Sequence, residues 1–409
     1  MLSRTALFNY SLFAMPLAVV ALPIYVYAPA FYAQQMHLSL AVIGMALLCT
    51  RLFDAFIDPA LGLWMDTTRR GGGYGKFILL SLPLLAAGFV GMFNPPAMAE
   101  GHALLWLIAC LSLVYPGFSL ATIAYQSWGA ALTQQRAARS RVTGVREACG
   151  LLGVVAAAVL PATIGLRGLS IVFLILLALG AWRLLRQAGE PTAATVAAEG
   201  NIFLPLRSKG FRWLFCVFVL NGIAAAIPAT LFQFFAEDRL HLGHQAGYLL
   251  GIYFLAGAAS MPLWVALARR QGEARAWLIS MLLAIAAFSW AYFLPAGSGV
   301  AFSVVCILSG LTLGADLALP PALLAAVIHQ ADHSGRREGA YFGLWSWATK
   351  MNLALAAGAA LPLLGTLGYV PGMRGEHGGL ALACTYALLP CAFKLAAGVL
   401  LFLSPLRDL

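Results

Sequence analysis

Charged side chains are scarce in this chain of 409 residues. Asp, Glu, Lys and Arg together make up 10% of the residues, whereas 62% are hydrophobic. A soluble domain carries roughly a quarter charged residues, so this chain has too little polar surface to cover itself in water. The composition argues against a soluble enzyme or binding domain and predicts a polytopic membrane protein.

Motifs of enzymes and metal sites are also lacking. The stretch 71–76 (GGGYGK) looks like part of a phosphate-binding loop, but the first glycine of that motif is missing, and Phe77 replaces the Ser or Thr that would follow the lysine. The seven cysteines are scattered through apolar runs and lack the spacing of metal ligands or of a disulfide framework. We therefore expect a protein that is not an enzyme and that holds neither a cofactor nor a metal.

Long apolar runs take up most of the chain. A membrane-spanning helix needs about 20 mostly apolar residues. The runs here are continuous rather than alternating, which favours helices over β-strands. Twelve transmembrane helices are predicted, at residues 8–33, 38–65, 77–95, 102–132, 142–165, 168–186, 212–236, 242–268, 275–295, 298–330, 340–369 and 377–404.

The longest polar interval, 187–211, separates six apolar runs from six. The second and eighth runs end alike, since Trp64 precedes Arg69 and Trp264 precedes Arg269 by the same spacing. We therefore predict an all-α membrane protein with an N-terminal six-helix half (1–186), a cytoplasmic linker (187–211) and a C-terminal six-helix half (212–409). This organisation is that of the major facilitator fold.

Basic residues are distributed unevenly between the loops. If twelve runs span the membrane, eighteen of the 25 Lys and Arg residues lie on one face and three on the other. Such asymmetry marks the cytoplasmic side. We therefore expect both termini in the cytoplasm of a bacterial-type inner membrane, and the net charge of +10 does not indicate nucleic-acid binding.

The stretch 51–70 (RLFDAFIDPALGLWMDTTRR) places carboxylates inside an apolar run. Arg51, Asp54 and Asp58 are three and four residues apart, so they share one helix face. Ionisable residues at membrane depth mark ion or proton pathways. Two carboxylates one turn apart can coordinate a small cation through oxygen, or hold a proton, because like charges favour protonation of one of them. The alternative is a structural ion pair with Arg51.

Two further basic residues lie within apolar runs. Lys350, in the eleventh run, needs a ligand or a carboxylate such as Asp54 or Asp58. Arg146 opens the fifth run next to Glu147. Arg146 either faces a cavity and binds the transported solute, or pairs locally with Glu147.

Other charged residues suggest gates. Asp66 stands at the cytoplasmic end of the second run beside Arg69, where we expect it to cap a helix or lock a gate. Asp316 in the tenth run is interpreted either as a gate or relay, or as the acceptor of an internal hydrogen bond. Lys394 in the last run is expected to snorkel towards the membrane surface.

Aromatic residues in the runs are candidates for the solute cavity. Tyr125 and Trp128 lie in the fourth run and Trp345 in the eleventh. Their rings either stack on a ligand or pack between helices.

The residues just described resemble a known family. The stretch 51–70 resembles the second-span signature of the glycoside–pentoside–hexuronide:cation symporters, the melibiose-permease-like branch of the major facilitator superfamily. The stretches 125–146 (YQSWGAALTQQRAARSRVTGVR) and 335–355 (GRREGAYFGLWSWATKMNLAL), and the GYVPG at 368–372, are similar to segments of that family as well. The resemblance is spread over both halves.

The resemblance implies a cation-coupled symporter. In that family the two second-span carboxylates form the cation site, here Asp54 and Asp58. The eleventh-span lysine near that site corresponds to Lys350. A fifth-span arginine of the sugar site is matched by Arg146.

The chain also departs from the family pattern. Ile57 stands where sodium-using members often have Asn, and Thr122 stands where the family has an aspartate. The loss of oxygen ligands favours H⁺ over Na⁺ as the coupling ion. The first run contains no acid to match the sugar-binding aspartate, so we do not carry over sugar specificity. The substrate and coupling candidates are Lys350, Arg51, Arg146, Tyr125, Trp128, Thr122 and Trp345.

We therefore expect a monomeric secondary transporter that couples a cation to the symport of a small organic solute by alternating access. Its partners would be that solute and membrane lipids. An exporter working as an antiporter, and a lipid or lysophospholipid transporter, are the alternatives on the same fold.

Overall fold

The computed structural model describes residues 3–68, 73–96, 101–132, 136–187, 201–334, 336–369 and 376–408. All regular structure within these ranges is helical, so the predicted fold class is confirmed. Ten helical stretches of the described residues are long and apolar enough to cross a membrane. With α3 (Leu40–Thr68) and α11 (Glu338–Thr366), each 29 residues long, they account for the twelve predicted helices.

The chain divides into two compact units. Unit 1 consists of Met1–Pro205 and Ile328–Trp347, and unit 2 consists of Leu206–Val327 and Ala348–Leu409. The start of α11, which the sequence assigns to the C-terminal half, therefore belongs to unit 1. Most of the predicted linker lies outside the described residues.

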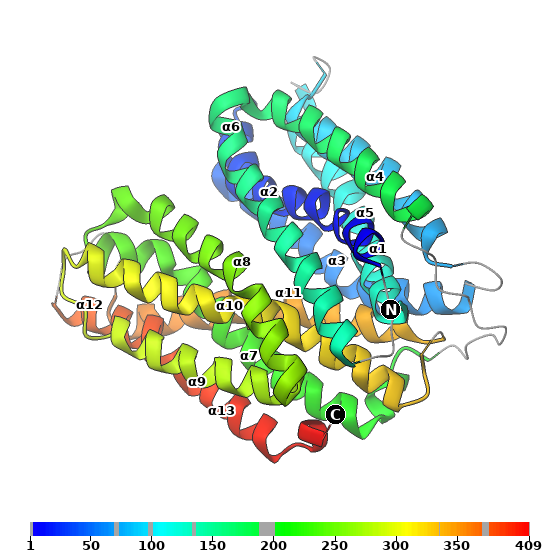
Figure 1. Cartoon of the computed structure of the whole chain (residues 1–409). Helices are drawn as coiled ribbons and strands as arrows, with labels where there is room; N and C mark the ends of the chain where they lie inside the picture. Colours follow the sequence, from blue (N-terminus) through cyan, green and yellow to red (C-terminus); the bar gives the residue numbers. More distant parts are fainter. Residues whose placement is uncertain are drawn as a thin grey trace. The chain divides into compact units, whose positions relative to one another are not determined.

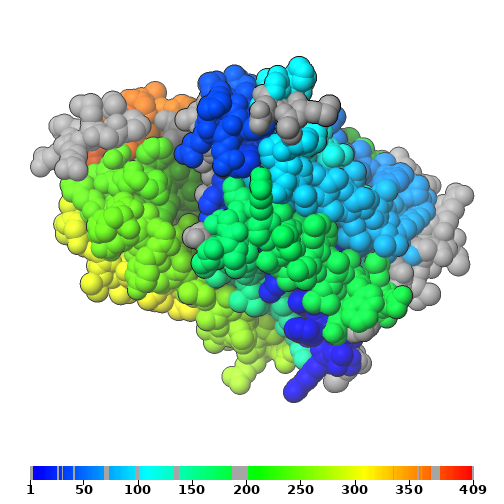
Figure 2. All heavy atoms as spheres, turned by 90° about the horizontal axis from the view of Figure 1, so that it is seen from above, coloured from blue at the N-terminus to red at the C-terminus, as the bar shows by residue number. Residues whose placement is uncertain are grey.

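Unit 1 is a bundle of packed helices (Figure 1). Within it, α2 packs against α6, and α5 packs against both α3 and α4. Figure 2 shows the blue and cyan part of the chain as a space-filling surface seen from above. Its helices besides α3 and the start of α11 are α1 (Arg4–Ser11), α2 (Ala14–Gln34), α4 (Gly75–Phe93), α5 (Ala103–Ala131) and α6 (Arg136–Gln187).

The fifth and sixth predicted spans are two helices within α6, separated by a kink. The kink is at Gly165, whose φ of 70° is not helical. Glycine adopts positive φ without the steric cost of a Cβ, so the chain reverses there. The stretches Ala138–Pro161 and Thr163–Arg186 on either side are each long and apolar enough to span the membrane.

Unit 2 is also helical. Its long helices are α7 (Lys209–Phe234), α8 (Ala246–Gln271), α9 (Glu273–Ala291), α10 (Gly299–Gln330) up to residue 327, the rest of α11, and α13 (Leu389–Leu403). Shorter elements are η3 (Phe235–Arg239), η4 (Gly243–Gln245), α12 (Glu376–Ala383), η5 (Cys384–Leu388) and η6 (Pro405–Asp408). The short helix η2 (Leu204–Arg207) begins in unit 1 and ends in unit 2. Helix α13 packs against α7 and α9, as Figure 1 also shows.

Two π-helical turns meet in the core of unit 2. Phe235 lies on η3 and Tyr386 on η5. Both are buried, and their rings stack 4.0 Å apart with an angle of 7° between their planes. Single π turns within α-helices are frequent at functional sites. Here one of them aims Tyr386 at the cavity described below.

Close packing of α3 against the start of α11 depends on glycines. A Cβ on Gly62 would collide with the carbonyl oxygen of Gly339, and a Cβ on Gly343 would lie 2.7 Å from the carbonyl oxygen of Asp58. No other side chain fits there. The glycines of the 335–355 stretch therefore place the start of α11 beside the acidic part of α3.

Candidate functional site

The predicted acidic stripe lies on α3. Asp54 and Asp58 are 2% and 0% exposed, and Arg51 is half-buried on the same helix. Pro59 directly follows Asp58 inside α3 and cannot donate the backbone hydrogen bond of its position. The structure thus places two buried carboxylates one helical turn apart, at a point where the backbone hydrogen bonds of α3 are interrupted.

A residue of α5 forms a hydrogen bond with Asp54. The hydroxyl of the buried Ser119 donates to Asp54 Oδ1 at 2.9 Å. Asp54 also lines a small cavity of about 240 Å³ between α3 and α5, together with Thr50 and Tyr115. The cavity gives Asp54 a neighbouring space of the size of a few water molecules.

Asp66 caps a helix. Its Oδ1 accepts from the backbone N–H of Gly339 at 2.9 Å, and its Oδ2 accepts from that of Ala340 at 2.7 Å. These are among the first N–H groups of α11, which have no partner within the helix and carry its positive dipole end. Tyr74 also donates to Glu338 Oε2 at 3.0 Å. The capping role predicted for Asp66 is therefore observed, and Arg69, its predicted companion, lies outside the described residues.

The aromatic candidates of α5 are packing residues. Tyr125 donates to the carbonyl oxygen of Tyr10 at 2.8 Å, and Tyr10 donates to that of Tyr125 at 3.0 Å. The two rings lie 4.6 Å apart. Tyr125 is 2% exposed and Trp128 is fully buried. In this structure both rings are packed between helices, and their contact with a solute stays a prediction.

Arg146 forms a local ion pair. Its Nε and Nη2 both donate to Glu147 Oε1, at 2.9 and 2.6 Å. Arg146 is buried, whereas the side chain of Glu147 is 24% exposed. Of the two interpretations of Arg146, the structure shows local pairing with Glu147.

The other candidates are distributed over both units. Thr122 is half-buried on α5, and Trp345 is buried on the part of α11 that belongs to unit 1. Lys350 is half-buried on the part of α11 that belongs to unit 2. Its pairing with Asp54 or Asp58 stays a prediction.

Unit 2 holds a charged network that sequence reasoning missed in part. Lys394 Nζ lies 2.6 Å from Asp316 Oδ2 and donates to Asn221 Oδ1 at 2.9 Å. Asp316 Oδ1 accepts from Trp277 Nε1 at 2.8 Å and from Asn221 Nδ2 at 3.2 Å. Four helices, α7, α9, α10 and α13, each contribute one of these residues. Asp316 therefore accepts internal hydrogen bonds, which is the second of its two interpretations.

The expectation that Lys394 snorkels to the membrane surface is wrong. Its side chain is 10% exposed and pairs inside the unit, because an opposite charge is available on α10. Charges within membrane spans commonly pair with each other. The sequence indicated this pairing only through the presence of Asp316 in the tenth run and of Lys394 in the last run.

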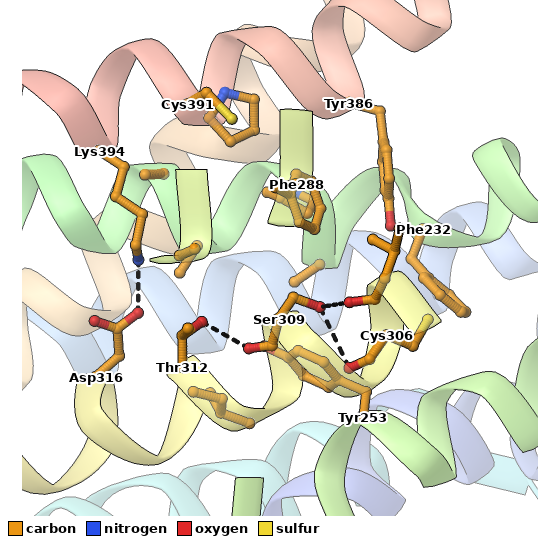
Figure 3. Close-up of a pocket in the computed structure, with 18 of the residues that line it drawn as sticks. Phe232, Tyr253, Phe288, Cys306, Ser309, Thr312, Asp316, Tyr386, Cys391 and Lys394 are labelled. Atoms are coloured by element: carbon orange, nitrogen blue, oxygen red, sulfur yellow. Dashed lines mark hydrogen bonds and ion pairs between the residues drawn. The ribbon is translucent and has the colours of Figure 1, made fainter. Parts of the chain in front are cut away.

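The ion pair lines a cavity. The cavity has a volume of about 580 Å³ and is enclosed by residues of α7, α8, α9, α10, η5 and α13. Figure 3 shows Lys394 and Asp316 facing each other at one end, with Phe288, Tyr386 and Phe232 toward the other. The cavity thus has a charged end and an aromatic end.

Comparison with known proteins identifies the family. The family model described as MFS/sugar transport protein matches residues 9–408. The chain is 23% identical over 411 residues to a Bacillus subtilis (strain 168) protein named uncharacterized symporter YjmB, covering 94% of this chain and 88% of that one. It is 22% identical over 406 residues to the glucuronide carrier protein homolog of Escherichia coli (strain K12), covering 93% and 87%.

The fold is that of solved transporters. A crystal structure of a bacterial homologue of the iron transporter ferroportin, in an outward-facing state, superposes with a TM-score of 0.74 at 15% identity, covering 97% of this chain and 98% of that one. At this identity the likeness concerns the fold alone. Together with the family match, it makes the chain an integral membrane transporter of a small solute rather than an enzyme. The chain belongs to the MFS/sugar transport protein family, the glycoside–pentoside–hexuronide:cation symporters that its motifs resemble.

Proposed function

We propose that the protein is a proton-coupled symporter of a small organic solute in a bacterial inner membrane. The observation that carries the proposal is the burial of Asp54 and Asp58 on one face of α3, inside a membrane span. Carboxylates are expensive to bury at that depth and mark cation pathways. The name of the Bacillus subtilis relative as a symporter supports coupling of this kind.

Protons suit this site better than sodium ions. A Na⁺ site needs several oxygen ligands, but Ile57 and Thr122 stand where the resemblance leads one to expect an amide and a carboxylate. The hydroxyl of Ser119 donates a hydrogen bond to Asp54. A proton needs only one basic carboxylate, and Asp54 and Asp58 both offer one.

The remaining candidates have supporting roles in this proposal. Arg51, on the same helix, balances the charge of the two carboxylates when the proton leaves. Lys350 is the counter-charge that the family resemblance implies. Asp66 holds the first turn of α11 in place and would release it when the cytoplasmic gate opens. Transport would follow the alternating-access mechanism of such transporters.

The coupling site is tested by the stability of the purified protein. Thermal unfolding in detergent is recorded across pH, with and without Na⁺, for the wild type and for Asp54→Asn and Asp58→Asn. A cation that binds only the folded protein raises its stability. We expect stability that falls as pH rises and does not respond to Na⁺, and we expect Asp58→Asn to remove most of this pH dependence.

Glu237→Gln is the matched control. Glu237 is exposed on η3, on a different helical element from Asp54 and Asp58. The same acid-to-amide change there should leave the pH profile intact. A Na⁺-dependent rise that Asp58→Asn abolishes would replace H⁺ with Na⁺, and folded Asp54→Asn and Asp58→Asn proteins with wild-type profiles would refute the cation site.

A further inference from the structure

The ion pair of unit 2 is open to a cavity on one side and braced by neutral groups on the other. Asp316 and Lys394 both line the cavity, with side chains 14% and 10% exposed. Asn221 and Trp277, which hold them, are 4% and 0% exposed. A pair that served only to join helices would have no need to face an open space of about 580 Å³.

Neutral groups hold the two charges unequally. Trp277 and Asn221 both donate to Asp316 Oδ1, whereas of these two residues only Asn221 accepts from Lys394. Lys394 reaches the pair on a flexible four-carbon stem from α13. The carboxylate is therefore the fixed partner, and the ammonium group is the one that can turn to a ligand in the cavity.

The rest of the wall indicates the kind of ligand. Rings of Tyr253, Phe288 and Tyr386 line the cavity. The hydroxyls of Ser309 and Thr312 donate to carbonyl oxygens of their own helix, at 2.6 and 2.7 Å, as Figure 3 shows. Such a surface suits a ring or an apolar body better than a chain of hydroxyl groups. The volume falls in the range of small-molecule sites, about 300–1,000 Å³.

We propose that Lys394 binds the anionic group of an organic anion in this cavity, in exchange for Asp316, which takes up a proton. The anion and Asp316 compete for one ammonium group. When the ligand takes it, an ionised Asp316 would be left buried without its counter-charge, which is strongly unfavourable. Protonation relieves that cost, so one proton enters with each anion.

This inference rests on the proposed function, because it assigns the solute of the symporter to a chemical class. It also adds a second protonation site to the one on α3. Tyr253 on α8 and Cys391 on α13 are further ionisable groups near the pair. Their ordinary pKa values, about 10 and 8.5, lie well above the range in which a carboxyl group titrates, so Asp316 is the group exchanged.

Binding is measured on the purified full chain with matched acid and neutral probes. The acids are phenyl β-D-glucuronide, benzoate and benzenesulfonate, and their neutral counterparts are phenyl β-D-glucoside, benzyl alcohol and benzenesulfonamide. We expect at least one acid to bind the wild type and its neutral counterpart to bind weakly. The dissociation constant of that acid should rise with pH, by up to about tenfold per unit for one linked proton.

The variants separate the two partners. Lys394→Gln should weaken acid binding about ten- to a hundred-fold, because a charge-assisted hydrogen bond is lost. Asp316→Asn should bind the acid at least as tightly as the wild type and lose the pH dependence, because the internal competitor is already neutral. Lys209→Gln, which removes an exposed lysine, should bind like the wild type.

A folding defect is separated from a binding defect by a double variant. Each single change leaves one charge of a buried pair alone and is expected to lower stability. Asp316→Asn/Lys394→Gln removes both charges and keeps groups that can hydrogen-bond to each other. We expect it to unfold at a higher temperature than Lys394→Gln and still to fail to bind the acid.

Three results would overturn the inference. They are acid binding by folded Lys394→Gln equal to that of the wild type, acid binding abolished in folded Asp316→Asn, and no binding of any of the three acids to the wild type. The outcome is independent of the α3 site. If Asp58→Asn removes the pH dependence of stability but Lys394→Gln binds the acid like the wild type, this inference fails and the α3 site stands. If Lys394→Gln loses acid binding but Asp58→Asn keeps the wild-type pH profile, the α3 site fails.

Discussion

His333 lies between α10 and α11, outside the membrane-spanning segments. Its Nδ1 is 2.9 Å from the hydroxyl of Tyr341. Partial burial lowers the pKa of His333 below its usual 6.5, and the positive charges of Arg337 and Arg336 lower it further, against the opposing effect of Asp332. This ring is therefore neutral at pH 7 and resists protonation in the folded protein.

That shift predicts a pH dependence of stability. As pH falls below about 6.5, the unfolded chain takes up a proton at this position more readily than the folded protein, so the free energy of unfolding decreases. At higher pH the effect is absent. His333→Gln, which cannot ionise, should lose this small decrease, which thermal unfolding between about pH 7.5 and pH 5 would detect. Identical profiles for the variant and the wild type would contradict the prediction.

At the scale of elements, the contact between α3 and the start of α11 combines three features. Gly62 of α3 and Gly339 of α11 bring the two backbones together. Asp66 then satisfies the first N–H groups of α11. The same short segment of α3 carries Asp58. A change of the α3–α11 contact would therefore be felt at the predicted cation site.

The close approach is tested by adding one methyl group. Gly62→Ala would place a Cβ against the Gly339 carbonyl and should cost about 1–3 kcal/mol, as overpacking does. Gly44→Ala on the same helix meets no atom within 4 Å, so it should be neutral or slightly stabilising, because alanine favours helix over glycine. The two unfolding temperatures are compared in one detergent. A Gly62→Ala protein as stable as Gly44→Ala would show that the contact is not tight.

At the scale of the whole molecule, the charge asymmetry of the loops predicts the orientation in the membrane. Twelve helices bring both ends of the chain to the same side, and the basic loops place that side in the cytoplasm. A green fluorescent protein fused after Leu409 should fluoresce, and alkaline phosphatase fused there should be inactive. Fusion of the phosphatase at Gly243, after one more crossing by α7, should give an active enzyme. The opposite pattern at either point would overturn the predicted topology.

Several site residues could be predicted because they are costly where they stand. Asp54, Asp58 and Asp66 are charged residues in or beside an apolar run, and the structure buries all three. The partners of these residues could not be predicted in the same way. Ser119 is separated from Asp54 by 65 residues, and no local pattern indicates which of many buried serines will lie there.

For residues with two plausible roles, the surroundings observed in this structure depend on packing between helices. Tyr125 and Trp128 are as suitable for stacking on a ligand as for filling a core, and only the neighbouring helices bury them. Arg146 paired with the adjacent Glu147 rather than facing a cavity. The snorkelling prediction for Lys394 fails because it rests on the last helix alone, whereas the partner of Lys394, Asp316, lies on α10.

The sequence by itself determined the solvent, the helices and the family. Apolar runs of about 20 residues must span a membrane as helices, because a backbone in lipid has to satisfy its own hydrogen bonds. Tertiary structure alone decided which charges meet. The network of Asn221, Trp277, Asp316 and Lys394 joins four helices, and such a pairing depends on helix rotation and register, which arise from packing between helices rather than from any one of them.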